Sequence, residues 1–253
     1  MRDFVGLFDT QSIVVLTSEV DDAAVALLTE REAALVERAI PKRKREFATA
    51  RGLARAALAR LGHPGAEILN APDRSPIWPE GVAGSITHSD TRAFVAACEV
   101  GLGTVGVDTE HREELKRDLW KTVFLREEIA ALDAMPEADR GRLALVLFSA
   151  KEALYKAQYP WTREFMGFHE LRVDLRPSLH VGALAGRFDC VFQRDVGPFP
   201  EGGVVEGRWL SPGPGSALAE VVSGVHIGAR SGEPLVRGGS QGPPMSGRST
   251  FST

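Results

Sequence analysis

Two carboxylates stand at alternate positions close to the end of an apolar run. They are Asp108 and Glu110, in the segment GVDTE at 106–110. The β-branched and apolar residues of 104–108 predict a strand, and alternate side chains of a strand point to the same side. Both carboxylates can therefore face one point, as a hard divalent cation such as magnesium requires of its oxygen ligands. The alternative is a pair of solvated acids at a strand end.

A second group of charged residues lies in the segment FSAKEALYK at 148–156, within a helix predicted over 138–158. The helix has an apolar stripe that indicates its core face: Leu143, Leu147, Ala150, Leu154 and Ala157. At about 100° per residue, Glu152 and Lys156 lie one turn apart on a different face. Glu152 can thus complete an oxygen ligand set with the two strand carboxylates. A Glu-x-x-x-Lys pair is also typical of a surface ion pair.

The segment 38–60 is strongly basic although the whole chain carries a net charge of -4. It contains eight Lys and Arg residues and only one acid, Glu46. Such a patch attracts phosphates or an acidic protein surface, and the alternative is a solvated helix face. The acidic overall balance argues against a nucleic-acid partner. Arg51 and Arg55, one helical turn apart, can reach the same ligand.

The remaining pattern predicts a mixture of strands and helices. Helices are expected over 22–38, with Asp21 or Asp22 as N-cap, from Pro41 to Gly62, and over 127–135. The segment 70–84 is rich in Pro and Gly and reads as turns. Strands are expected over 12–17, 93–100, 173–175, 186–193, 204–210 and 218–227. The same coarse order of strand, helices and strands recurs on either side of about residue 103, which suggests two similar halves.

Two further strings suggest other chemistries. Residues 101–106, GLGTVG, match G-x-G-x-x-G, but a dinucleotide site needs a helix directly afterwards, and a strand is predicted there. Residues 85–90, SITHSD, contain Ser, His and Asp but no G-x-S-x-G elbow, which disfavours a hydrolytic triad. His88 can instead donate a hydrogen bond to a phosphate, although a lone histidine is more often structural.

Length and composition bound the remaining possibilities. The 253 residues allow one or two domains, and no apolar run is long enough to span a membrane. Cys98 and Cys190 lie in apolar runs and are predicted to be buried thiols of a cytoplasmic protein. The Gly-, Ser- and Pro-rich segment 229–253 is predicted to be a disordered tail.

Four motifs, in this order along the chain, resemble those of the monomeric, two-subdomain 4′-phosphopantetheinyl transferases. The basic helix start is KRKREF at 42–47, followed by Arg51. The substrate loop comprises PIWPEG at 76–81 and GSITHS at 84–89, and the two signature motifs lie at 106–110 and 148–156. The resemblance covers about residues 40–170 and, more loosely, the chain up to about 228. This family activates carrier proteins of polyketide, nonribosomal-peptide and siderophore synthesis.

The resemblance implies an α+β fold of two α/β subdomains related by a pseudo-twofold axis. Each subdomain is expected to be a small, mostly antiparallel sheet packed with helices, over 1–103 and 104–228, with the active site between them. The implied reaction moves phosphopantetheine from coenzyme A to a serine of an acyl or peptidyl carrier protein and releases adenosine 3′,5′-bisphosphate. The implied protein is a monomer with no membrane partner.

The resemblance also assigns roles to residues. Asp108, Glu110 and Glu152 hold magnesium, with manganese as the other candidate ion, against the coenzyme A pyrophosphate. Lys156, together with Lys151, stabilises charge on the departing phosphate. The nucleotide end, including its 3′-phosphate, is bound by a second group of residues: Arg43, Arg51, Arg55, Thr87 and His88. Arg74 is expected to replace a lysine that the family carries in the substrate loop.

The general base has three candidates. Glu152 can take the serine proton directly or through a water molecule. Some family members carry a glutamate in the helix after the aspartate motif, and Glu128, beside Glu127, is nearest to that place. A carboxylate that binds a cation has a low pKa and is a weak base, which favours water or Glu128.

Two alternatives come from other functional classes. One is a catalytically inactive protein that binds coenzyme A or a carrier protein, against which the intact acids and Lys156 argue. The other is a nicotinamide oxidoreductase, against which the strand after the glycine string argues. Phe148, where many relatives carry tryptophan, is a mild departure from the family pattern.

Overall fold

The computed structural model describes residues 2–3, 6–111, 114–176, 185–211 and 220–229. Except for its first residue, the predicted tail at 229–253 lies outside this part of the chain. The helices are α1 (Glu30–Leu35), α2 (Pro41–Arg60), α3 (Trp120–Val123), α4 (Arg126–Asp133) and α5 (Glu137–Thr162). Short 3-10 turns cover Asp22–Leu27, Val100–Leu102, Arg117–Leu119 and Phe168–Glu170.

Two antiparallel sheets carry most of the strands. The first has the order β1 (Arg2–Asp3), β2 (Val14–Glu19), β6 (Arg92–Glu99) and β5 (Val82–His88). The second has the order β7 (Gly103–Glu110), β11 (Val221–Gly228), β10 (Val204–Leu210), β9 (Ala185–Phe192) and β8 (Leu171–Leu175). A small hairpin joins β3 (Leu69–Asn70) to β4 (Pro76–Ile77). Antiparallel sheets packed with helices confirm the predicted α+β class, and the division near residue 103 stays a prediction.

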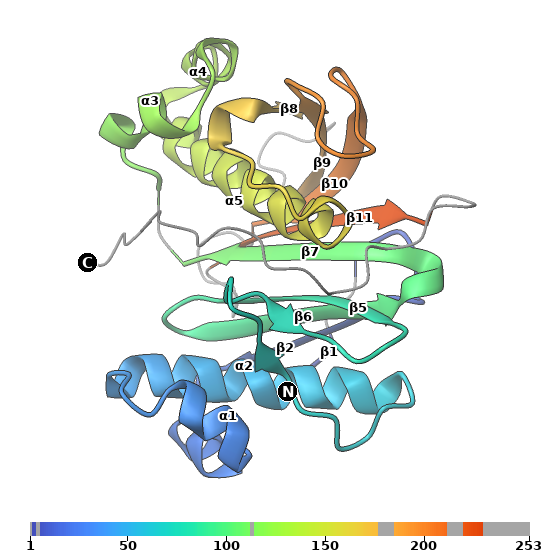
Figure 1. The fold of residues 1–253 in the computed structure, drawn as a ribbon. Coiled ribbons are helices and arrows are strands. Elements are labelled where there is room, and N and C mark those ends of the chain that lie inside the picture. The colour runs from blue at the N-terminus through green and yellow to red at the C-terminus, as the bar shows by residue number, and fades with distance from the viewer. Residues whose placement is uncertain (1, 4–5, 112–113, 177–184, 212–219, 230–253) are drawn as a thin grey trace.

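The elements form layers, with one long helix on the outer side of each sheet (Figure 1). Helix α2 packs on the first sheet around Leu53, Leu58 and Val95. Helix α5 packs on the second sheet, where Leu154 and Phe188 are fully buried. A third core lies between the sheets and mixes residues of both: Val15, Phe94, Ala96, Val105, Val107 and Val222. The two halves therefore share buried apolar surface.

The sheets meet along their edge strands β5 and β7 (Figure 1). Ser85 on β5 makes one of the polar contacts between these strands. Its Oγ accepts a hydrogen bond from the Val107 amide at 3.0 Å and donates to the Val107 carbonyl at 3.4 Å. A side chain thus takes the place of backbone pairing and satisfies both polar groups of this edge residue.

Gly106 brings β7 unusually close to α5. A Cβ atom at this position would lie 1.9 Å from the Ala153 carbonyl oxygen and 2.7 Å from the Ala157 nitrogen. Only glycine permits this approach, which places the acidic end of β7 beside the charged residues of α5. The last glycine of the G-x-G-x-x-G string therefore serves strand–helix packing, consistent with the strand predicted after Gly101.

The prediction of one continuous helix over 22–38 was wrong. Asp21 caps a 3-10 turn through its Oδ1, which accepts from the Ala23 amide at 2.9 Å. The chain is extended at Leu28, and α1 then begins after Thr29. Thr29 and Glu32 form a capping box, with both hydrogen bonds at 3.2 Å. This local signal for a helix start outweighs the Ala- and Leu-rich composition around it.

Other predictions hold more closely. Helix α2 has Pro41 in its first turn, and Gly62 follows its end with a φ of 85°. In contrast, the segment expected to be a substrate loop is partly a strand, because residues 84–88 belong to β5. Cys98 and Cys190 are buried free thiols, as expected. Among the described residues, no helix is both long and apolar enough to cross a membrane.

Candidate active site

Asp108 is the centre of a buried polar cluster between β7, β5 and α5. The residue is 5% exposed. Its Oδ1 accepts hydrogen bonds from Lys156 Nζ at 2.7 Å and from Thr87 Oγ1 at 3.2 Å. Its Oδ2 is buried and has no hydrogen-bond partner. A buried carboxylate oxygen without a donor is costly, so it marks a place for a cationic ligand.

Glu152 and Lys156 complete this cluster from one face of α5, as their spacing predicts. Burial raises the pKa of the Glu152 carboxyl, and the charge of Asp108 raises it further. Burial alone would lower the pKa of Lys156, but the nearby carboxylates of Asp108, Glu152 and Glu110 outweigh it and raise that pKa. Asp108 thus binds the ammonium group directly, and Glu152 is near enough for its charge to influence both groups.

The predicted set of three metal-binding acids is only partly assembled. In the described ranges, no three His, Cys, Asp or Glu side chains are grouped as a metal ion would need. Asp108 and Glu152 nevertheless fit a divalent cation, because they supply hard oxygen atoms, repel each other and leave Oδ2 of Asp108 without a donor. The place of Glu110 in this set stays a prediction.

His88, at the end of β5, lies in a field of positive charge. The Arg43 guanidinium from α2 donates to His88 Nε2, and Glu46 Oε2 lies 3.6 Å from Nδ1. Arginine has only donors, so Nε2 is the acceptor and Nδ1 carries the hydrogen. Burial lowers the pKa of His88 to about 4, with further lowering by Arg43, Lys156 and Arg51. The imidazole is therefore neutral near pH 7, in a setting that would attract an anion.

Arg51 is the buried cation of the same region. Its guanidinium stacks on the Phe47 ring at 4.3 Å and donates through Nη2 to Asn70 Oδ1. Burial lowers the pKa of Arg51 to about 10, and its Nε has no hydrogen-bond partner. A planar fork that is held by stacking and keeps a free N–H suits a phosphate group.

The structure does not bring Arg55 to the same ligand as Arg51. Arg55 Nη1 pairs with Glu32, which is fully buried, and Nη2 donates to the Leu27 carbonyl at 2.7 Å. More than three turns of helix separate Arg55 from Arg43, which lies near the start of α2. Arg55 thus fastens the α1 region to α2, and its predicted role in cofactor binding is corrected to a structural one.

The structure also places Glu128 and Lys151 outside the predicted active site. Lys151 Nζ donates to Glu128 Oε2 at 2.7 Å and to three carbonyl oxygens, those of Val123, Phe168 and Leu171. Glu128 also accepts from the amides of Leu125 and Val173, both at 2.7 Å. Both side chains are 2% exposed or less. Their hydrogen bonds are used inside the fold, so the predictions of Glu128 as base and Lys151 as phosphate contact are corrected.

Arg74 is exposed in the turn of the β3–β4 hairpin, where its φ is 68°. The hairpin is held against α5 by its neighbour Asp73, whose Oδ2 accepts from the Tyr159 hydroxyl at 2.7 Å. No contact of Arg74 with the Asp108 cluster is present among the described residues, so its role as a phosphate contact stays a prediction.

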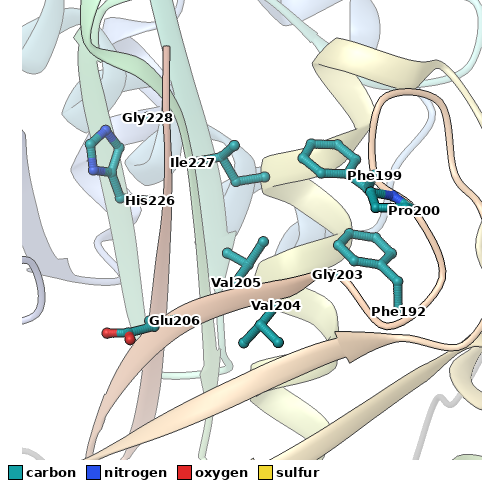
Figure 2. Close-up of a pocket in the computed structure, with 10 residues that line it drawn as sticks. All are labelled: Phe192, Phe199, Pro200, Gly203, Val204, Val205, Glu206, His226, Ile227 and Gly228. Atoms are coloured by element: carbon teal, nitrogen blue, oxygen red, sulfur yellow. The ribbon is translucent and has the colours of Figure 1, made fainter. Parts of the chain in front are cut away.

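A separate hollow of about 370 Å³ lies where β10 and β11 diverge (Figure 2). None of the predicted site residues lines it. Its walls present both polar and apolar surface and come from Phe192, Phe199, Pro200, Gly203, Val204, Val205, Glu206, His226, Ile227 and Gly228. The hollow is therefore distinct from the charged cluster around Asp108.

Sequence reasoning missed Ser85 and Glu220. Ser85 joins the two sheets, and the Glu220 carboxylate accepts hydrogen bonds from hydroxyl groups of both sheets. No local pattern could have found Glu220, which is a single acid inside the strand predicted over 218–227. Ser85 lies inside the motif at 84–89, but nothing in the sequence indicates its contact with Val107.

Comparison with known proteins identifies the family of this chain. Residues 31–98 match the model of the 4′-phosphopantetheinyl transferase N-terminal domain, and residues 104–194 match that of the 4′-phosphopantetheinyl transferase superfamily. The chain is 37% identical over 225 residues to the 4′-phosphopantetheinyl transferase Svp of Streptomyces mobaraensis, covering 85% of both chains. The chain therefore belongs to the 4′-phosphopantetheinyl transferase superfamily.

Two other relatives match over shorter stretches. The 4′-phosphopantetheinyl transferase Npt of Nocardia iowensis is 38% identical over 143 residues, which is 55% of this chain and 62% of that protein. The 4′-phosphopantetheinyl transferase PptT of Mycobacterium tuberculosis is 38% identical over 147 residues, which is 56% of this chain and 63% of that protein.

Proposed function

We propose that the chain is an active 4′-phosphopantetheinyl transferase that requires a divalent cation, magnesium or manganese. It transfers phosphopantetheine from coenzyme A to a serine of an acyl or peptidyl carrier protein. The observation that carries the proposal is Asp108, a buried acid with one oxygen bound by Lys156 and Thr87 and the other without a donor. The shared family and the position of Lys156 beside Asp108 support it.

In this proposal the cation is held by Asp108 and Glu152, with Glu110 as a further ligand. When bound, it neutralises charge on the pyrophosphate oxygens. Lys156 keeps its ammonium group charged, because its pKa is raised, and it stands beside Asp108 where it can compensate charge on the departing phosphate. Phosphoryl transfer depends mostly on positioning and electrostatics, which this arrangement of fixed charges suits.

The nucleotide end would bind at α2 and β5. Arg43 and Arg51 offer guanidinium donors, and Thr87 offers a hydroxyl beside them. A phosphate bound near His88 would raise the pKa of the imidazole, because a negative charge favours its protonated form. His88 would then be able to donate from both ring nitrogens.

The chemical step balances without a further reactant. The serine oxygen of the carrier forms a bond to the phosphorus that bears the pantetheine arm, and the bond from that phosphorus to the bridging oxygen breaks. The bridging oxygen leaves with adenosine 3′,5′-bisphosphate. With Glu128 occupied by Lys151, the groups left to take the serine proton are Glu152 and a water molecule.

Mass spectrometry of a carrier protein tests the proposal. An apo carrier is incubated with coenzyme A, magnesium chloride and the protein, and parallel reactions contain EDTA or manganese. We expect the phosphopantetheine mass increase on serine with either metal and none with EDTA. Coenzyme A binding by calorimetry without any transfer to several carriers would favour the inactive binding protein instead.

A further inference from the structure

Glu220 is a buried acid that lies directly before β11 and is 2% exposed. Its carboxylate accepts hydrogen bonds from three hydroxyl groups. Oε1 accepts from Ser89 at 2.7 Å and from Thr91 at 2.5 Å, and Oε2 accepts from Thr109 at 2.9 Å. A buried carboxylate costs free energy unless donors satisfy it, so these hydroxyl groups determine where it sits.

The three donors come from both sheets. Ser89 and Thr91 form the turn between β5 and β6, in the first sheet, whereas Thr109 lies on β7, in the second. The Ser89 hydroxyl also accepts from the amides of Thr91 at 3.2 Å and Arg92 at 3.1 Å, so it shapes the turn as well. Glu220 itself directly precedes β11 of the second sheet, so its Oε1 joins that sheet to the turn of the first, and its Oε2 fixes the carboxylate against β7.

Both anchored segments lead directly into the candidate active site. His88 immediately precedes Ser89, and Asp108 immediately precedes Thr109. Because side chains alternate along a strand, Thr109 points away from the face that carries Asp108. Glu220 therefore lies on the opposite side of β7 from Asp108 and constrains the backbone that carries the active-site residues.

We propose that Glu220 is a positioning residue of the transferase, which fixes the spacing between His88 and Asp108. The inference rests on the proposed function, in which coenzyme A contacts the first sheet at one end and the Asp108 cluster at the other. Without the carboxylate, the two segments still have contacts between β5 and β7 near them, such as Thr87 with Asp108, but lose the hydrogen bonds from Ser89, Thr91 and Thr109 to one shared group. An error of about 1 Å in such spacing can cost about 10²-fold in rate.

A double-mutant cycle tests the coupling. One arm is Thr109→Val, which removes the hydrogen bond between Glu220 and β7. The other is Ser89→Ala with Thr91→Val, which removes the hydrogen bonds between Glu220 and the turn of the first sheet. If Glu220 connects this turn to Thr109, each arm lowers kcat by about tenfold or more, and the combined variant is hardly worse than either arm, because both arms interrupt the same series of contacts. Losses that multiply in the combined variant would show independent structural effects and overturn the proposal.

Two further variants control the interpretation. Glu220→Gln keeps an acceptor oxygen for the turn and can donate its NH₂ to the Thr109 hydroxyl, so we expect kcat within about threefold of the wild type. Thr122→Val, on the exposed side of α3, is a matched substitution outside the network. A full loss of kcat with Glu220→Gln, at an unchanged melting temperature, would indicate that Glu220 acts through its charge instead.

The wild-type protein separates this proposal from the proposed function. If the wild type transfers no phosphopantetheine in the same assay, the function fails and the cycle is read from coenzyme A affinity measured by calorimetry. Coupled losses in that affinity would still support positioning by Glu220, and additive or absent losses would contradict it.

Discussion

The Glu128 carboxylate on α4 and the Lys151 ammonium on α5 lie 2.7 Å apart in the interior of the protein. Burial raises the pKa of Glu128 and lowers that of Lys151, and the attraction between them opposes both shifts. Together with five backbone groups, they form a buried network of hydrogen bonds. A general base needs a proton to come within its reach.

Lys151→Met should therefore destabilise the protein without affecting the chemical step. Removing one partner of a buried ion pair leaves an uncompensated charge and costs about 3–5 kcal/mol of the free energy of unfolding. Urea unfolding measures this loss. At a temperature where the variant is folded, kcat should remain within about threefold of the wild type. A folded Glu128→Gln variant with no turnover would instead restore Glu128 as the base.

Asp108→Ala and Glu152→Ala should each abolish transfer, with a loss in kcat of at least about 10³-fold, equivalent to about 4 kcal/mol of transition-state stabilisation. The reason is that these two acids form the proposed cation site. The mass-shift assay, run at several magnesium concentrations, measures the loss. Glu127→Ala, an exposed acid beside α4's buried Glu128, is the control. Near-full activity of either site variant would remove the metal assignment.

Arg51→Ala and Arg55→Ala should have different effects although both remove an arginine from α2. Arg51 is proposed to contact coenzyme A, and a hydrogen bond to a charged group contributes about 1.5–3 kcal/mol, so the KM for coenzyme A should rise about 10- to 100-fold. Arg55 pairs with Glu32, so its loss should lower the melting temperature and leave that KM unchanged. Steady-state kinetics and thermal unfolding on both variants decide between the roles. Equal KM changes would return Arg55 to the binding site.

His88 should make stability depend on pH. Its pKa in the folded protein is about 4, because of burial and of the cations Arg43, Lys156 and Arg51. The unfolded chain has an ordinary value of about 6.5 and binds more protons between these limits. This contribution to stability is therefore complete above pH 6.5 and is lost as the pH falls toward 4, by at most about 3 kcal/mol.

Urea unfolding of the wild type and His88→Gln at pH 7 and pH 4.5 checks this expectation. The difference in free energy of unfolding between the two pH values should be smaller in the variant. An equal difference in both proteins would show that His88 does not titrate as its surroundings indicate.

The parts of the site that local sequence could predict are those with a local signal. Alternation along a strand placed Asp108, and helical spacing placed Glu152 and Lys156 on one face of α5. Pro41 and Gly62 marked the ends of α2 for reasons of backbone geometry. The resemblance supplied the family and pointed to Arg43, which the structure places in contact with His88.

The parts that failed depend on contacts between distant segments. Glu128 and Lys151 looked available because nothing in the sequence shows that they meet 23 residues apart. Arg55 is spaced so that it could share a ligand with Arg51, but it forms an ion pair with Glu32 on α1 instead. The residues of β5 were expected in a loop because Pro and Gly are frequent over 70–84 and the resemblance placed 84–89 in the substrate loop. They instead form a strand that is mostly buried.

The meeting of β5 and β7 has a consequence for each sheet taken alone. Both strands lie at sheet edges, where unpaired backbone groups can recruit another chain, and each strand covers the other. A fragment that ended before Gly103 would leave the β5 rim and the apolar side of β6 open to solvent. Such a fragment would be prone to self-association, so the two halves protect one another against aggregation as well as enclosing the site.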